Sequence, residues 1–258
     1  MNRKESISVT ERNFMVVERI KELKSDHPFW GYRRIWSHLK YIDGLDVNKK
    51  RIYRLMQKHD LLVKANTRIK ATRTSGKSKP RPARPYEWWG IDMTKVMVEG
   101  FGWMYIVVVL DWYTKKIVGH YVGEQCRSKH WLEALNSAVN HEFPDGVKDH
   151  GLSLMSDNGS QPTSVAFIKS CRDMGIKQAF TSYGNPKGNA DTERIFRTMK
   201  EELLWLRDWH SPFELADNLH NWIESYNRSY LHSSLGYKSP MKFEEEYKNN
   251  QPTLLVTA

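Results

Sequence analysis

Hydrophobic residues recur at helical spacing in the first part of the chain. Phe14, Val17, Ile20 and Leu23 are three or four residues apart, which predicts a helix that begins near Arg12. Spacing of this kind is typical of a helix with one apolar face.

Two shorter helices are expected next, one after the break at Gly31 and one after Asn48, a residue that commonly caps a helix N-terminus. Each has three apolar residues on one face: Ile35, Trp36 and Leu39 in the first, and Ile52, Leu55 and Met56 in the second. The second helix is also strongly basic, and such a pair is typical of a helix-turn-helix. Any small helical bundle has the same spacing, so the pattern alone leaves that alternative open.

Beyond residue 86 the pattern changes to short apolar runs that alternate with helical segments. Strands are predicted at 88–96, 101–112, 117–122, 152–155 and 176–181, and helices at 128–141, 164–174 and 190–206. The second strand contains an aliphatic run at 106–110, as a central strand buried on both faces would. Three strands followed by alternating helices and strands indicate an α/β fold with a mixed five-stranded sheet flanked by helices.

The composition narrows the class of protein. With 258 residues, 40% of them hydrophobic and 12% aromatic, the chain can bury a core and is unlike a disordered protein. Its longest apolar stretch, 104–110, is shorter than the roughly 18 residues of a membrane span, and no apolar segment follows the charged N-terminal residues as in a secretory signal. Two cysteines without a C-x-x-C pair argue against a disulfide framework and a cysteine zinc site. We therefore expect a soluble, cytoplasmic protein.

The net charge of +10 is unevenly distributed. Residues 1–85 contain 22 Lys and Arg against 8 Asp and Glu, whereas the rest of the chain contains 18 against 22. The densest part, 63–85, has eight cations, three prolines and no acid, which is typical of an extended basic linker. Such a segment fits a polyanionic partner, because cations that meet phosphates release condensed counterions, and a solvated tail is the alternative.

Three acids occupy positions that the predicted fold would bring together. Asp92 is in the first strand, Asp157 follows the fourth strand, and Glu193 is in the first turns of the last helix. Ligand sites of open α/β sheets lie near strand ends, and a helix packed across the sheet can bring Glu193 to the same place. Taken singly, each acid is also an ordinary surface charge or turn former. Arg197 and Lys200 share a helix face with Glu193 and would suit phosphates, although an ion pair along the helix is the simpler interpretation.

These acids and the residues around them resemble the signature of retroviral-type integrases and related transposases, in which 35 residues separate the second Asp from the Glu, as they do here. The motifs that carry the likeness are WGIDMT at 89–94, SDNGSQ at 156–161 and GNADTER at 188–194. Flanking motifs are similar to the second-frame (OrfB) proteins of the IS-three family of bacterial insertion-sequence transposases: GYRRI at 31–35, NKKRIYRLM at 48–56, YN at 226–227, HSSLGY at 232–237 and SP at 239–240. One departure is Asn158, where many relatives have Arg.

The resemblance implies a ribonuclease H-like fold and a DDE transposase that cleaves DNA and transfers 3′-hydroxyl ends at the termini of an insertion sequence. Asp92, Asp157 and Glu193 would be its catalytic and metal-ligating residues, with two Mg²⁺ ions as cofactors and Mn²⁺ as a substitute, because hard oxygen ligands suit these ions. The chain would then have four sections: a helix-turn-helix DNA-binding domain at 1–63, a basic linker at 64–85, an integrase-like catalytic core at 86–246 and a C-terminal tail at 247–258.

The partners implied by the resemblance are double-stranded DNA, both the terminal inverted repeats and the target, and further copies of the chain. The product of an upstream reading frame is another candidate, no membrane is involved, and the location would be the bacterial cytoplasm at the nucleoid. DNA contacts are expected from twelve cations and one amide: Arg33, Arg34, Lys49, Lys50, Arg51, Arg54, Lys64, Arg68, Lys70, Arg73, Arg197, Lys200 and Asn158. The alternatives on the same fold are a nuclease without strand transfer and a catalytically silent DNA-binding repressor, and the intact acid triad argues against the repressor.

Overall fold

The structure of the chain, a computed structural model, describes residues 7–63, 80–181 and 189–250. It divides into two compact units, Met1–Arg73 and Thr74–Ala258, each with its own buried residues. Of the predicted linker at 64–85, only 80–85 lies within the described residues.

The first unit is helical, as predicted. Its three helices are α1 (Ile7–Asp26), α2 (Tyr32–Tyr41) and α3 (Lys49–Lys58). The Asn48 side chain accepts a hydrogen bond of 2.8 Å from the Lys50 amide, which confirms the predicted cap of α3. The helix was expected to begin near Arg12, but it begins at Ile7, one turn earlier. Phe14, expected on the apolar face of α1, is 62% exposed, and Val16 is buried instead.

The second unit contains the predicted mixed five-stranded sheet, in the order β3-β2-β1-β4-β5. The strands are β1 (Trp88–Val98), β2 (Gly102–Asp111), β3 (Ile117–Gly123), β4 (Ser153–Ser156) and β5 (Lys177–Phe180). β1 pairs antiparallel with β2 and β2 with β3, whereas β4 is parallel to both β1 and β5. The aliphatic run of β2 is buried on both faces of the sheet, as its sequence predicted.

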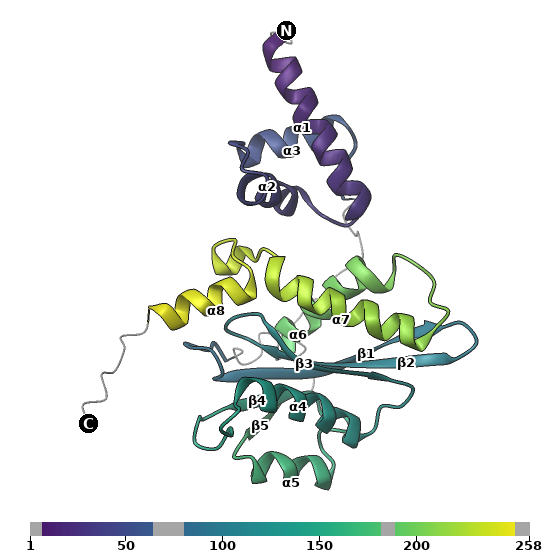
Figure 1. The fold of residues 1–258 in the computed structure, drawn as a ribbon, viewed down its shortest axis with the longest axis vertical. Helices are drawn as coiled ribbons and strands as arrows, with labels where there is room; N and C mark the ends of the chain where they lie inside the picture. Colours follow the sequence, from purple (N-terminus) through teal and green to yellow (C-terminus); the bar gives the residue numbers. More distant parts are fainter. Residues whose placement is uncertain (1–6, 64–79, 182–188, 251–258) are drawn as a thin grey trace, which may run out of the picture. The chain divides into compact units, whose positions relative to one another are not determined.

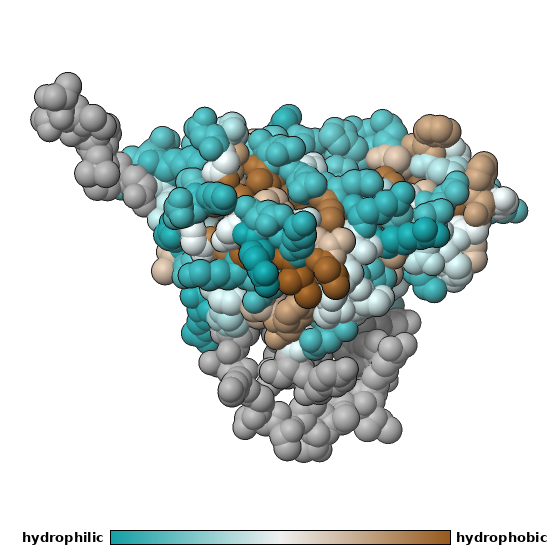
Figure 2. All heavy atoms as spheres, turned by 90° about the horizontal axis from the view of Figure 1, so that it is seen from below, coloured by the Kyte–Doolittle hydropathy of each residue, from teal (hydrophilic) through white to brown (hydrophobic). Residues whose placement is uncertain are grey.

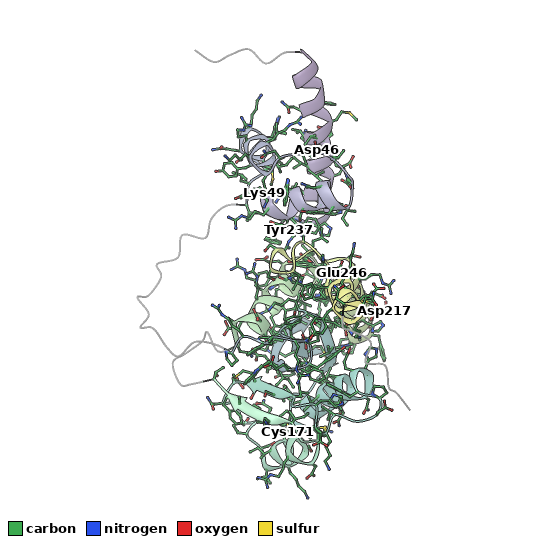
Figure 3. The ribbon with its side chains drawn as sticks, turned by 90° about the vertical axis from the view of Figure 1, so that its left-hand side faces the viewer. Asp46, Lys49, Cys171, Asp217, Tyr237 and Glu246 are labelled. Carbon is green, nitrogen blue, oxygen red and sulfur yellow. The ribbon has the colours of Figure 1, made fainter. Side chains whose placement is uncertain are left out.

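Helices cover both faces of the sheet (Figure 1). One layer consists of α4 (Ser128–Glu142) and α5 (Val165–Asp173), and the other contains α6 (Ala190–Met199), α7 (Pro212–Ser229) and α8 (Pro240–Asn249). Figure 3 shows the same layers from the side, with Cys171 below the sheet and Asp217 and Glu246 above it. The sequence analysis placed no helix beyond residue 206, although Leu215, Leu219 and Ile223 have helical spacing and are buried in the core.

The prediction of one α-helix over 190–206 was partly wrong. The α-helix ends at Met199 and continues as a π-helix, η2 (Lys200–Leu204). Because a π-turn contains an extra residue, the apolar stripe changes phase along the helix. Leu203 is buried as predicted and Leu204 is buried with it, whereas Leu206, which was expected in the stripe, lies beyond the end of η2 and is 43% exposed.

Viewed from the α5 side, hydrophilic residues dominate the surface of the second unit, and hydrophobic ones gather near its centre and towards its right-hand end (Figure 2). The large exposed hydrophobic side chains of this unit include Met97, Phe101 and Trp103 at the turn between β1 and β2. None of the helices in the described ranges has the length and apolar character of a membrane span.

Candidate active site

The pairing of β1 with β4 accounts for the nearness of the first two acids. Gly90 on β1 lies opposite Met155 on β4 in a parallel pair. Asp92 and Asp157 each follow two residues later in these parallel strands. The two acids therefore lie at the same level along the sheet, near the C-terminal end of β4. Glu193 lies in the first turn of α6, which packs against β1.

The charges of Asp157 and Glu193 act on the carboxyl group of Asp92. The pKa of Asp92 is raised to about 6, first by burial and then by the charges of Asp157 and Glu193, while a hydrogen bond from the Met93 amide acts in the opposite direction. Lys200 is also near enough for its positive charge to lower the pKa of Asp92. The acids at the end of β4 and on α6 are therefore close enough to Asp92 on β1 for their charges to influence its ionisation.

The acids differ in exposure. Asp92 is half-buried, and its Oδ1 atom accepts a hydrogen bond of 2.8 Å from the Met93 amide. Asp157 and Glu193 are exposed, and Asp157 Oδ1 accepts a hydrogen bond of 3.0 Å from the Gly159 amide. Across 7–63, 80–181 and 189–250, no three His, Cys, Asp or Glu side chains converge closely enough to hold a metal ion as they lie. The residues themselves fit such an ion, because carboxylate oxygens are the ligands that hard divalent cations prefer. A bound cation would also relieve the repulsion between the three carboxylates.

The polar residues predicted beside the acids lie on α6, on η2 and in the turn after β4. Arg197 is exposed on α6 and donates to Glu201 Oε1 at 2.8 Å, an ion pair along the helix with an acid outside the predicted stripe of Glu193, Arg197 and Lys200. Lys200 begins η2, where the helix changes to π-helical. Asn158 is exposed, and its Nδ2 atom donates to the Thr181 carbonyl at 2.6 Å.

A residue that the sequence analysis did not single out connects α6 to the strand of Asp92. Asn189, directly before α6, is 3% exposed, and its Nδ2 atom lies 3.5 Å from Asp92 Oδ2. A Cβ atom at Gly90 would overlap Thr192 Oγ1 and Trp112 Nε1, so glycine in this strand permits the close approach of α6. Asn189 lies in the motif at 188–194, but an asparagine before a helix is typical of an ordinary N-cap, so its position in the sequence did not indicate a contact with Asp92.

The start of α6 is also held by the turn between β2 and β3. Lys115 Nζ donates to Asp191 Oδ2 at 2.9 Å, two residues before Glu193. The Tyr226 hydroxyl on α7 donates to the Lys115 carbonyl at 3.0 Å and is 2.9 Å from His232 Nε2. The C-terminal motifs of the sequence therefore support the turn that contacts α6.

In the helical unit, most of the predicted DNA-contact residues already make side-chain contacts. Arg51 donates to Asn13 Oδ1 at 2.9 Å, and the Lys49 ammonium lies 4.1 Å from the centre of the Trp36 ring. Arg33 donates to the Tyr32 hydroxyl at 3.1 Å, Arg34 lies over the Trp30 ring, and Arg54 donates to the Lys50 carbonyl at 3.4 Å. Arg33, Lys50 and Arg54 are exposed. The predicted contacts Lys64, Arg68, Lys70 and Arg73 lie outside the described residues.

Comparison with protein families identifies both units. Residues 82–186 and 174–240 each match a model of an integrase core domain, and residues 11–68 match a model of an HTH-like domain. The integrase core matches together span β1 to the start of α8.

Insertion-sequence proteins are similar over nearly the whole chain. The transposase for insertion sequence element IS904 of Lactococcus lactis subsp. lactis (strain IL1403) is 30% identical over 257 residues, covering 95% of this chain and 99% of that protein. An IS600 31 kDa protein of Shigella sonnei is 30% identical over 89% of this chain and 88% of its own length. Transposase InsD of IS2 in Escherichia coli is 23% identical, covering 88% of this chain and 77% of its own.

A solved structure has the same fold. A chain of the simian T-cell lymphotropic virus intasome, determined in complex with PP2A regulatory subunit B56 gamma, superposes with a TM-score of 0.53 at 15% identity and covers 91% of this chain and 76% of its own. The fold of the second unit is therefore the ribonuclease H-like integrase fold expected from the sequence.

Proposed function

Since the chain belongs to the insertion-sequence transposases with an integrase core domain, we propose that Asp92, Asp157 and Glu193 form the catalytic centre of this DNA transposase. The observation that carries the proposal is the placement of the acids: the parallel register of β1 and β4 puts Asp92 and Asp157 side by side, and α6, which packs against β1, carries Glu193 in its first turn. The raised pKa of Asp92, about 6, agrees with this placement. Such a cluster is costly unless cations neutralise it.

The reaction proposed is cleavage of a DNA strand at each end of the element, followed by attack of the freed 3′-hydroxyl on target DNA. Asp92 and Asp157 would ligate or bridge two Mg²⁺ ions, with Glu193 on the second, and Mn²⁺ would substitute. When bound, such ions activate the attacking oxygen and stabilise the departing 3′ oxygen.

The residues of the chain contribute position and charge. Asp92 is anchored in the sheet by its Met93 hydrogen bond, whereas Asp157 and Glu193 are exposed on the side where DNA would approach. Lys200, whose charge reaches Asp92, and Arg197, one turn from Glu193, would hold the backbone beside the scissile phosphate. Asn158 follows Asp157 and would orient it or contact the DNA.

The helical unit and the linker would bind double-stranded DNA outside the catalytic centre. The exposed cations of α3 suit phosphate contacts that position the duplex. Because two ends of one element must be joined to a target, we propose that the chain acts as a homo-oligomer on DNA, with the product of an upstream reading frame as a further partner.

The decisive experiment compares Asp157→Asn with Asp173→Asn, which removes an exposed carboxylate on α5. Nicking and joining of a labelled terminal-repeat duplex in Mg²⁺ should fall by more than the roughly 10–100-fold typical of losing a residue that only supports a metal ligand. DNA binding and Tm should be unchanged, and Asp173→Asn should behave as the parent chain. Undiminished Mg²⁺-dependent product from Asp157→Asn would refute the assignment.

Strand transfer is tested separately with pre-cleaved DNA that already has a 3′-hydroxyl end. Joined products that depend on Mg²⁺ support the transposase reaction. Cleavage without any joining would identify a nuclease, and neither product with retained binding would identify a silent DNA-binding protein.

A further inference from the structure

Asn189 does not use its side chain as its position predicts. An asparagine directly before a helix normally accepts a hydrogen bond from an amide of the first turn. Asn189 has φ −117° and ψ 25° as the residue before α6, and its side chain makes no such bond. It is 3% exposed and directed across the sheet, towards β1.

The contacts of the amide group fix its orientation. Its Nδ2 atom lies 3.4 Å from the Ile91 carbonyl and 3.5 Å from Asp92 Oδ2, and both are acceptors, so the NH₂ group must face them. The other oxygen of Asp92 accepts from the Met93 amide at 2.8 Å. One carboxylate oxygen of Asp92 is therefore held by its own strand and the other by the start of α6.

The opposite side of the same amide is unsatisfied. Asn189 Oδ1 is buried without a hydrogen-bond partner among the described residues, and it would lie 2.9 Å from a Cβ atom at Gly90. A buried acceptor without a partner is destabilising, because it has lost its hydrogen bonds to water and gained none. Asn189 therefore departs from two local preferences, because it does not cap its helix and its buried acceptor has no partner. Departures of this kind are characteristic of functional sites.

We infer that Asn189 is a positioning residue of the catalytic centre: its amide fixes Asp92 Oδ2 and ties the strand of Asp92 to the helix of Glu193, so that both carboxylates are placed for a divalent cation. The inference rests on the proposed function. Groups that hydrogen bond metal-ligating carboxylates orient them, and their loss typically weakens metal binding or activity by 10–100-fold.

The test is the affinity of the full-length chain for Mn²⁺ alone, measured by isothermal titration calorimetry. Asn189→Ala should weaken Mn²⁺ binding by about 10-fold or more. In nicking assays its kcat should fall while KM for the terminal-repeat duplex is unchanged, because no DNA contact is removed. Asn189→Ser keeps a residue that is favoured at a helix start, but its side chain is too short to reach Asp92. It should lose Mn²⁺ affinity in the same way, and it is used in place of Asn189→Ala if that variant is poorly folded.

The matched control is Thr192→Val. Thr192 Oγ1 accepts from Trp112 Nε1 at 3.3 Å in the same contact between α6 and the sheet, but it makes no hydrogen bond with Asp92. This variant should lower Tm and leave Mn²⁺ affinity and kcat at parental values. Equal losses of Mn²⁺ affinity in Thr192→Val and Asn189→Ala would show that only helix packing matters and would overturn the inference.

Asp92→Asn separates failure of the inference from failure of the proposed function. If Asp92→Asn retains nicking, the proposed catalytic centre is wrong, whatever Asn189 does. If Asp92→Asn is inactive and Asn189→Ala binds Mn²⁺ as the parent chain does, only the positioning role is wrong.

Discussion

The side-chain amide of Asn227 on α7 makes hydrogen bonds with both main-chain groups of Ile117, the first residue of β3. Asn227 Oδ1 accepts from the Ile117 amide and its Nδ2 donates to the Ile117 carbonyl, each at 2.9 Å, although 110 residues separate the two in the chain. A side chain thus pairs with the strand as a neighbouring backbone would. The helix after the π-turn is thereby joined to the turn that contacts the start of α6.

Asn227→Ala should destabilise the second unit. Two buried main-chain groups would lose their partners at about 1–3 kcal/mol each, so we expect the free energy of unfolding to fall by roughly 2–6 kcal/mol in urea denaturation. Asn221→Ala, on the exposed side of the same helix, should change it by less than about 0.5 kcal/mol. A similar value for the two variants would contradict the role of the Asn227 amide.

Asp92 should destabilise the chain at neutral pH when no divalent cation is present. Burial raises the pKa of Asp92 from 3.8 to about 6, so the folded state binds this proton more tightly than the unfolded state does. The associated stability is present below pH 3.8 and is lost as the pH rises through about 6. In EDTA, Asp92→Asn should therefore be more stable than the parent chain at pH 7, by about 3 kcal/mol, and the difference should shrink towards pH 4. A difference that does not vary with pH would contradict this expectation.

Glu244 on α8 should make the opposite contribution to acid stability. Burial acts to raise its pKa, but hydrogen bonds from Lys248, Tyr86 and Lys116 outweigh it and lower the pKa of Glu244 to about 2. Its contribution is therefore present above pH 4.5 and is lost as the pH falls towards 2. Glu244→Gln should lower Tm at pH 7 and lose less stability than the parent chain between pH 5 and pH 3. Glu245→Gln, an exposed neighbour, should follow the parent chain over the same range.

Gly90→Ala should displace α6 from β1. The added methyl would overlap Thr192 Oγ1 and Trp112 Nε1, and overpacking of this kind typically costs about 1–3 kcal/mol. Because α6 carries Glu193, we expect nicking to fall together with Tm. Gly31→Ala, where a Cβ would meet nothing within 4 Å, serves as the control and should leave nicking unchanged.

The cations of α3 should divide between DNA binding and folding. Lys50 is exposed, so Lys50→Ala should weaken DNA binding and reduce the slope of log K against log salt by about 0.9, the value for one phosphate contact. Arg51 donates to Asn13 on α1, so Arg51→Ala should mainly lower the stability of the helical unit. Fluorescence anisotropy at several salt concentrations and thermal unfolding distinguish these effects. An unchanged salt slope for Lys50→Ala would remove this residue from the DNA interface.

Local patterns predicted the elements whose signal lies within one segment. The aliphatic run of β2 and the cap at Asn48 needed no distant partner, and both were confirmed. The end of the helix that carries Glu193 was predicted wrongly, because the helix turns π-helical after Met199 and ends at Leu204, before the predicted residue Leu206. α7 was missed even though Leu215 and Leu219 had helical spacing.

The sequence by itself determined which acids were candidates, because residue type and motif spacing are properties of the chain alone. Only the tertiary structure decided how they meet: the parallel register of β1 and β4 places Asp92 near Asp157, and the packing of α6 brings Glu193 into their field. The tertiary structure also revealed the role of Asn189. Its side chain contacts a strand that is distant in the sequence, and such a contact depends on how the elements pack and has no periodic pattern in the sequence.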